Sequence, residues 1–505
     1  MGRVRRSAAP EPISAAPEAR VEPLPPARAV LVVHGMGQQV RFQGLDQIAQ
    51  GLLRETGGGT RNPVARTVKI GDETYQRLEL LLSLPGGGER EVHVYEAYWA
   101  PITEGQVTLR DVTSFLFGAV FNGVRNLGGA LRYSFGRAST IWPAFSAVIA
   151  LGSAFGVLLT LVAMNGVLLA LAALNGLEPG FVSDSLKGHL TEGQPALLAI
   201  LAAFSLATLA LLLVLAGVEW VKTRMARVRL NGLWRTLGAA LQALFLLWLS
   251  LTLLAGLAVA VLVSGFGPAS WMRDTFSCPW LAKHWMLPLA SLLLASATVR
   301  RLFVRYLGDV AAYVTSYKLD RFNDVRSRIK EITRKTAAAL YEATVDAESG
   351  TRAYEGVAVV AHSLGSVVAY DALNALLVDD MVSAEKRDVA ARTRLFLTFG
   401  SPLEKTAFLF ASQAKKTTDT REALVSALQP LISDYGFRPF PWVNVFSRRD
   451  PISGRLTSYD DSSQPLYRKR RIRNLPDRAA VVPLLAHLEY FSDPVVIRQL
   501  VRALR

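Results

Sequence analysis

The stretch VAVVAHSLGSVVAYDAL, residues 357–373, decides the fold. Small and β-branched apolar residues lead into the segment AHSLG, and a helix-like apolar pattern follows it. This order predicts a buried strand, a sharp turn and a helix, with the hydroxyl of Ser363 at the turn. Ala361 and Gly365, two positions before and after, are small, as the close approach of strand and helix requires. Ser363 is therefore either a nucleophile or a serine in an ordinary buried strand–turn–helix.

Strand-like and helix-like segments alternate on both sides of this stretch. Such an alternation predicts an α/β fold, with a mostly parallel sheet covered by helices on both faces. The expected strands are 30–33, 77–84, 91–99, 357–361, 394–399 and 442–447, and the expected helices are about 43–55, 302–346, 364–377 and a last one after His487.

The residues between the two α/β parts are strongly apolar. Four stretches, about 142–174, 196–218, 237–264 and 284–299, have the composition of transmembrane helices. The first three each hold about 20 or more uncharged residues, enough to cross a hydrocarbon core roughly 30 Å thick. The fourth is short and, taken alone, also fits a buried or re-entrant helix. If one sheet takes strands from both sides of the insert, both parts lie on one side of the membrane. An even number of spans, four, is therefore expected.

The charges favour a membrane surface as the partner. Most Lys and Arg beside the spans lie before the first, between the second and third, and after the fourth, which predicts both termini in the cytoplasm. The expected location is the inner (cytoplasmic) membrane, with the α/β domain on the cytoplasmic side. The net charge is +15, but no aromatic-interleaved basic stripe suggests nucleic acid. An anionic membrane surface is the better match. The basic cluster Arg468–Arg473 fits either a phosphate headgroup site or a solvated basic strand.

The single cysteine, Cys278, excludes an intrachain disulfide and a cysteine-rich zinc site.

Five parts of the chain are expected. Residues 112–140 predict an amphipathic helix in the membrane interface, with a core helix of the soluble domain as the alternative. The parts are a disordered tail (1–28), the first part of the α/β domain (29–111), the amphipathic helix (112–140), the transmembrane insert (141–300) and the second part of the α/β domain (301–505).

A catalytic serine needs a base, and His487 is found by elimination. It follows Ser363 in the chain order serine, acid, histidine. The alternative is a surface histidine that caps the last helix. The other histidines have other expected places: His189 and His284 on the outer side of the membrane, His93 within a strand, and His34 and His362 in the two turn motifs.

The acid is expected between them, just after a strand. Asp450 meets this requirement because it follows WVNVFS and opens a turn with Pro451. Its carboxylate would orient the imidazole of His487 and stabilise its charged form. Asp460 and Asp461 are competitors, but their position in a polar loop favours solvated turn residues.

Backbone N–H groups are expected to form an oxyanion hole. One is the N–H of Leu364, directly after the serine. The segment His34-Gly35-Met36-Gly37 follows an early strand, and the N–H of Met36 is the best second donor. Taken alone, this segment also fits an ordinary glycine turn.

The motifs VVHGMG, AHSLGSVVAYDAL, TFGSPL, the Asp450-Pro451 turn and AHLEYF together resemble the serine lipases and esterases of the α/β-hydrolase superfamily. The strand, turn and helix around Ser363 are similar to the nucleophile elbow of DDHD-type intracellular phospholipases. The resemblance covers roughly 29–100 and 303–500, and Ala361 departs from the commonest elbow pattern. It implies ester hydrolysis through an acyl-serine, with Ser363, Asp450 and His487 as the triad and no metal or organic cofactor.

The expected substrate is an acyl ester of a membrane lipid, because the catalytic domain is attached to spans, an amphipathic helix and basic flanks. The expected protein is thus a membrane-embedded lipase or phospholipase, and a thioesterase or acyltransferase would share the acyl-serine. A hydrolase fold without turnover, serving as a membrane scaffold or sensor, is the alternative from another class. A transporter is disfavoured because the spans contain few internal charges.

Overall fold

The computed structural model describes a large part of the chain, and the statements below concern that part alone. The described residues are 27–35, 40–58, 62–84, 88–103, parts of 110–124 and 152–167, 184–224, 231–265, isolated residues between 270 and 297, 320–345, 350–407, 429–448, 450, 452–477, 485–487 and 489–505.

One eight-stranded sheet forms the centre of the α/β domain, in the order β2-β3-β4-β1-β5-β6-β7-β8. From β4 to β8 neighbouring strands are parallel, while β3 is antiparallel to both β2 and β4. The predicted α/β fold with a mostly parallel sheet is therefore confirmed. The strands are β1 (Ala27–Val33), β2 (Val64–Ile70), β3 (Glu73–Ser83), β4 (Glu89–Ala97), β5 (Tyr354–His362), β6 (Thr393–Phe399), β7 (Trp442–Phe446) and β8 (Arg473–Pro476).

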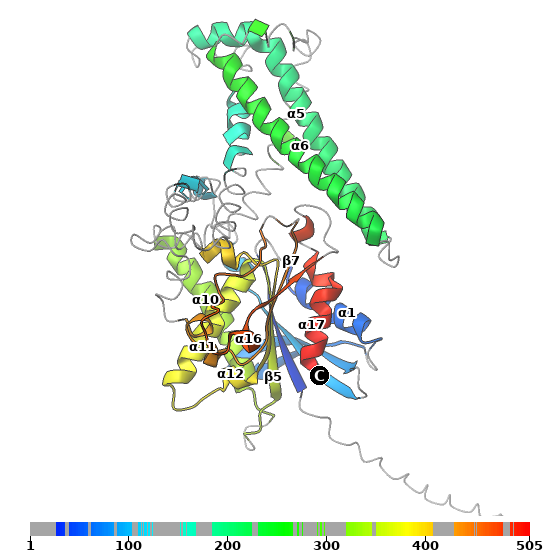
Figure 1. Cartoon of the computed structure of the whole chain (residues 1–505), viewed down its shortest axis with the longest axis vertical. Helices are drawn as coiled ribbons and strands as arrows, with labels where there is room; N and C mark the ends of the chain where they lie inside the picture. The colour runs from blue at the N-terminus through cyan, green and yellow to red at the C-terminus, as the bar shows by residue number, and fades with distance from the viewer. Residues whose placement is uncertain are drawn as a thin grey trace, which may run out of the picture.

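Helices cover both faces of the sheet (Figure 1). Helices α10 and α11 pack on one face, over side chains such as Leu31 and Val359. Helices α1 and α17 pack on the other, over Val30 and Val360. The alternation of Val30 with Leu31 shows why parallel strands read as unbroken apolar runs, because both faces are buried. The main helices of this domain are α1 (Gln43–Glu55), α10 (Asp320–Glu342), α11 (Leu364–Val382) and α17 (Pro494–Leu504), and the short ones are α2 (Ala100–Thr103), α12 (Val389–Arg392), α15 (Pro430–Ser433), α16 (Tyr467–Arg470), η2 (Tyr435–Phe437), η3 (Leu485–His487) and η4 (Tyr490–Ser492).

Strands β1 and β5 are adjacent although the apolar region separates them in sequence. They pair in parallel, with Val33 opposite Ala361. This pairing brings the end of the early strand, and His34 after it, next to the turn that carries Ser363.

Two long helices, α5 (Asp184–Arg224) and α6 (Asn231–Ser264), pack against each other and extend beyond the sheet domain (Figure 1). The indole N–H of Trp248 on α6 donates to Thr208 Oγ1 on α5 at 3.0 Å. Among the described residues, one helical segment, Leu247–Ser264, is long and apolar enough to cross a membrane, while Phe155–Val167 and Pro195–Leu211 are shorter apolar helices. The structure thus has helices within three of the four expected spans, and most of 284–299 lies outside the described residues.

Several expected element bounds need correction. The helix expected at 364–377 continues to Val382, and the strand expected at 77–84 begins at Glu73. Strand β2 was not expected. The basic cluster Arg468–Arg473, for which a solvated strand was considered, is helical up to Arg470 (α16) and enters β8 only at Arg473. Of the helix expected at 302–346, Asp320–Glu342 is helical, and residues 302–319 lie outside the described residues.

Candidate active site

Ser363 lies at the carboxyl edge of the sheet, in the turn between β5 and α11. Its φ of 51° and ψ of −132° place it in a backbone region that residues with a Cβ seldom adopt. Its N–H donates to the carbonyl of Phe399 at 3.0 Å, and its carbonyl accepts from Ser366 Oγ at 2.6 Å. The hydroxyl is therefore presented on a sharp turn that hydrogen bonds hold on both sides.

Two glycines allow the surrounding segments to approach this turn. A Cβ on Gly365 would lie 2.2 Å from the carbonyl oxygen of His34. A Cβ on Gly35 would lie 2.7 Å from the Cβ of Ser363. Both contacts are too short for any side chain, so these positions require glycine. The early glycine turn is thus in contact with the serine turn.

The structure brings Ser363, His487 and Asp450 together as a hydrogen-bonded chain. Asp450 Oδ2 accepts the Nδ1–H of His487 at 2.8 Å, which leaves Nε2 of the ring as an acceptor. Ser363 Oγ lies 2.6 Å from that Nε2 and donates its proton to it. All three side chains are buried. This order of contacts is the one a serine nucleophile, its base and an orienting acid require.

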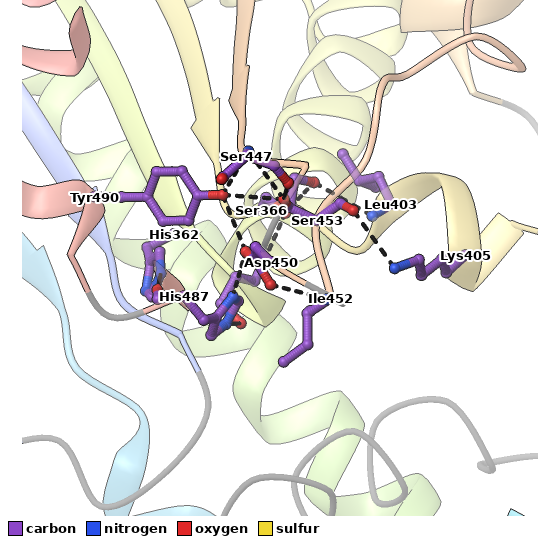
Figure 2. Close-up of polar contacts among 12 residues, drawn as sticks. His362, Ser366, Leu403, Lys405, Ser447, Asp450, Ile452, Ser453, His487 and Tyr490 are labelled. Atoms are coloured by element: carbon purple, nitrogen blue, oxygen red, sulfur yellow. Dashed lines mark hydrogen bonds and ion pairs between the residues drawn. The ribbon is translucent and has the colours of Figure 1, made fainter. Parts of the chain in front are cut away.

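Asp450 is held as a carboxylate by several donors. Besides His487, the N–H of Ile452 donates to Oδ1 at 2.8 Å and the hydroxyl of Tyr490 donates to Oδ2 at 3.0 Å (Figure 2). Burial alone would raise the pKa of Asp450. The attraction and hydrogen bond of His487, with the Ile452 N–H and the charge of Lys405, outweigh burial and lower this pKa to about 2.

His362 supports His487 from the turn itself. Its Nε2–H donates to the backbone carbonyl of His487 at 2.7 Å, and the two rings lie 4.9 Å apart between centroids. Burial is the main cause that lowers the pKa of His362 to about 3. A neutral ring at this position fits a structural role, as expected for a histidine of the turn motif.

His34 shapes the glycine turn after β1. Its Nε2 accepts the N–H of Trp99 at 3.0 Å, so its proton is on Nδ1, which donates to the carbonyl of Gly35 at 2.8 Å. The ring also stacks on Trp99, with centroids 4.6 Å apart. Burial lowers the pKa of His34 to about 4, so the ring is neutral near pH 7.

One of the two expected oxyanion donors is in the described part of the chain. Leu364 is buried and is the first residue of α11, where a backbone N–H has no partner within the helix. The positive end of the helix dipole also favours negative charge here. Met36 lies outside the described residues, although Gly35 before it contacts Ser363.

Asp460 and Asp461, the two alternatives to Asp450, form hydrogen bonds with residues other than His487. Asp460 Oδ1 accepts from the Arg438 guanidinium at 2.8 Å and from the hydroxyl of Tyr435 at 2.9 Å. The interpretation of Asp460 as a solvated turn residue is therefore wrong, because it forms an ion pair with a buried arginine. Asp461 accepts from the N–H and hydroxyl of Ser463, as a turn residue does.

One cluster of possible metal ligands occurs in the described part of the chain, away from Ser363. Ligand atoms of Glu79, Glu91 and His93 lie within 4.8 Å of one another. However, Glu79 Oε1 accepts from Arg77 at 2.9 and 2.5 Å, and Oε2 pairs with Arg66 at 2.8 Å. Because both oxygens of Glu79 are already bound to cations, the contacts favour an ion-pair network over a metal site.

A cavity of about 320 Å³ is lined by ten residues, none of which belongs to the proposed triad. Tyr98 in its wall lies 5.5 Å from His34 between ring centroids. The guanidinium of Arg41 lies over the rings of Phe42 and Tyr98, at 5.1 and 5.7 Å from their centroids. The full lining is Arg41, Phe42, Thr74, Tyr75, Gln76, Glu96, Tyr98, Pro101, Ile332 and Thr336.

Sequence reasoning missed several residues that hold the site together. Tyr490 contacts Asp450, and Ser401 Oγ lies 2.6 Å from Ser366 Oγ under the serine turn. Ser401 and Tyr490 lie in the motifs TFGSPL and AHLEYF, the first shortly after a strand and the second shortly after His487. The sequence therefore marked these segments as part of the site. Their partners, however, are distant in sequence.

Comparisons with known proteins add no relative. No family model matches the chain, and the searches of curated proteins and of solved structures also found no match. Function is therefore inferred from the site itself.

Proposed function

We propose that the protein is a serine hydrolase that cleaves acyl esters through an acyl-serine intermediate. The single observation that carries this proposal is the buried hydrogen-bonded chain from Ser363 through His487 to Asp450. His487 takes the hydroxyl proton as Ser363 Oγ attacks the ester carbonyl, and Asp450 stabilises the resulting imidazolium. The N–H groups of Leu364 and Met36 stabilise the oxyanion.

The remaining steps return the site to its starting state. The tetrahedral adduct breaks its bond to the alcohol oxygen, and His487 delivers its proton to that oxygen. Water then attacks the acyl-serine while His487 accepts one water proton and passes it to Ser363 Oγ as the acid leaves. No metal or organic cofactor enters these steps.

The proposed substrate is an acyl ester of a membrane lipid, as for a phospholipase or lipase. On this proposal an α/β-hydrolase sheet is split by an inserted transmembrane domain of four helices. Two observations support the proposal that the site faces a membrane. The apolar side chains of Leu254 and Leu257 on α6 are 59% and 62% exposed. The carboxyl ends of the parallel strands, where Ser363 lies, face the side of the molecule that carries α5 and α6 (Figure 1).

The described part of the amphipathic helix also fits a lipid interface. Val112 and Leu116 are buried, while Phe117, Phe121 and Val124 are 58–59% exposed. The exposed residues are four and three positions apart and so share one face of a helix. The buried residues anchor the helix to the protein. The segment therefore has features of both a helix in the membrane interface and a core helix, the two alternatives considered for it.

An anionic membrane surface is the proposed partner because of the Lys and Arg beside the apolar segments. The basic cluster Arg468–Arg473 lies at the amino end of β8, the end of the sheet opposite to Ser363. Arg468, Lys469, Arg471 and Arg473 are exposed, whereas Arg470 donates to the carbonyls of Tyr435 and Gly436. We place the protein in the inner membrane with its catalytic domain in the cytoplasm, and without a nucleic-acid partner.

A membrane scaffold without turnover remains the competing proposal. The complete chain of donors and acceptors at Ser363 favours catalysis over that alternative. Thioesterase and acyltransferase reactions use the same acyl-serine, so they differ only in the atom that leaves or accepts the acyl group.

The test is covalent labelling of the detergent-purified full chain by a fluorophosphonate probe. We expect labelling of the parent protein, its loss in Ser363→Ala and its retention in Ser383→Ala, which changes the half-buried C-cap serine at the far end of α11. His487→Ala should reduce labelling and turnover by at least about 1,000-fold. A parent protein that is not labelled, or equal labelling of Ser363→Ala, would show that Ser363 is not the nucleophile.

A further inference from the structure

Tyr490 is in direct contact with the acid of the proposed triad. Its hydroxyl donates to Asp450 Oδ2 at 3.0 Å, and the same oxygen accepts the Nδ1–H of His487 at 2.8 Å (Figure 2). The Tyr490 side chain is fully buried. Its hydroxyl and the catalytic imidazole therefore share one carboxylate oxygen.

The direction of the hydrogen bonds at Tyr490 is determined by its partners. The backbone N–H of Ser447 donates to the phenol oxygen at 2.8 Å, and Ser453 Oγ lies 3.0 Å from it. Because a backbone N–H only donates and a carboxylate only accepts, the phenol proton must lie between Tyr490 and Asp450. The two contacts on the far side of the phenol hold its oxygen in place.

The packing fixes the ring as well as the hydroxyl. Gly400, which has φ 59°, lies where a Cβ would come within 2.9 Å of the Tyr490 ring and 3.1 Å of His362 Nε2. His362 in turn donates to the backbone carbonyl of His487. The glycine that ends β6 thus leaves room for two rings, one bound to Asp450 and the other to the backbone of His487.

We propose that Tyr490 is a positioning residue of the site: it holds Asp450 Oδ2 in line with His487 Nδ1 and draws negative charge away from that oxygen. The inference rests on the proposed function. Lys405 Nζ, which donates to the carbonyl of Ser453 at 3.4 Å, is a second group that offsets the charge of Asp450. Further titratable neighbours are His362, which is neutral, and Asp477, which acts on Tyr490. Asp493 lies beside them, its N–H donates to the carbonyl of Tyr490, and burial with the charge of Asp477 raises its pKa to about 8.

Loss of the hydroxyl alone has two expected consequences. Asp450 Oδ2 keeps His487 as its remaining side-chain donor, so the carboxylate attracts the imidazolium more strongly and the acid limb of the pH–rate profile moves up by about half a pH unit. Asp450 is also less firmly oriented, so the rate on the plateau falls roughly tenfold. A purely structural role would lower the amount of active protein without moving the acid limb.

The experiment compares Tyr490→Phe with a matched control in the full chain. Tyr435→Phe removes a hydroxyl that also donates to a carboxylate, Asp460 at 2.9 Å, and accepts a backbone N–H, that of Asp461 at 2.7 Å. The rate of fluorophosphonate labelling and the kcat/KM for a p-nitrophenyl ester are measured against pH. We expect the acid limb to move in Tyr490→Phe and not in Tyr435→Phe. An unchanged limb in Tyr490→Phe, or the same shift in both variants, overturns the inference.

A second variant covers the case in which Tyr490→Phe does not fold. Incorporation of 3-fluorotyrosine at position 490 keeps the ring and hydroxyl but makes the phenol a stronger donor, so the acid limb should move to lower pH. A shift to higher pH, or no shift, contradicts the inference. Parent protein that is labelled at Ser363 while both Tyr490 variants keep its pH profile overturns the role of Tyr490 alone. A parent that is not labelled overturns the proposed function and this inference together.

Discussion

The backbone of Ser363 has a conformation that costs a residue with a Cβ about 1–3 kcal/mol. The cost is offset by the surrounding hydrogen bonds, because Ser366 bonds the carbonyl of Ser363 through both its N–H and its hydroxyl, at 2.9 and 2.6 Å. The hydroxyl of Ser366 also contacts Ser401 at 2.6 Å. Ser363 thus carries the backbone strain, while Ser366 and Ser401, which do not react, supply the hydrogen bonds that offset it.

Gly365 offers a test of this arrangement at the scale of one residue. A methyl group there would lie 2.2 Å from the carbonyl oxygen of His34 and 2.5 Å from that of Val33, so β1 and α11 would have to separate. We expect Gly365→Ala to lower the free energy of unfolding by about 3 kcal/mol or more and to reduce labelling of Ser363. Chemical denaturation in detergent measures this loss.

The control for that substitution is Gly88→Ala, at a site where no heavy atom lies within 4 Å of the added methyl group. It should leave the free energy of unfolding within about 0.5 kcal/mol of the parent value. Equal stability of the two variants would contradict the close packing of β1 against the serine turn.

At the scale of elements, the sequence predicted the buried parallel strands and the order of the site residues. Long apolar runs such as β5 have few alternatives, because both faces of the strand must be covered. Strand β2 was missed because most of its residues are exposed at the edge of the sheet. Strand β8 was missed because its four residues, Arg473–Pro476, are too few to form a pattern and follow a run of basic residues.

The candidate site was predicted in part for a related reason. Ser363, Asp450 and His487 each follow a recognisable turn or chain order, and the structure brings them into contact. Tyr490 lies in the motif AHLEYF, but the motif does not show which residues it contacts, because Ser447 and Asp450 are distant from it in sequence and reach it only in the folded chain. Contacts between loops depend on tertiary packing, which local pattern cannot show.

The exposed face of α6 provides a prediction at the scale of one element. Only 17% of the segment Leu247–Ser264 is buried within the protein. Asp at the centre of a membrane helix costs about 2.5–3.5 kcal/mol on insertion scales. We therefore expect the double variant Leu254→Asp, Leu257→Asp to leave the carbonate-resistant membrane fraction, whereas Val382→Asp, at an 82% exposed site on α11, should remain there. Parent protein that is soluble without detergent would contradict a membrane role for this face.

At the scale of the whole molecule, one hydrogen-bonded sheet joins residues from both sides of the apolar region. The register of β1 with β5 runs from Ala27 opposite Tyr354 to Val33 opposite Ala361. The contact is needed for the proposed site, because His34 and Gly35 at the end of β1 border the turn of Ser363. The α/β domain can form only if both parts of the chain meet in the same compartment.

This geometry predicts the membrane topology. If the apolar region crosses a membrane as proposed, the segments before α5 and after α6 lie on one side of it and the number of spans is even, because a strand pair cannot form across a bilayer. We expect reporters fused to the two ends of the full chain, one fluorescent only in the cytoplasm and one active only outside it, to place both ends in the cytoplasm. Each fusion must still be labelled by the fluorophosphonate probe, which shows that its sheet has formed. Ends on opposite sides in labelled protein would contradict an even number of spans, and both ends outside would contradict the orientation inferred from Lys and Arg.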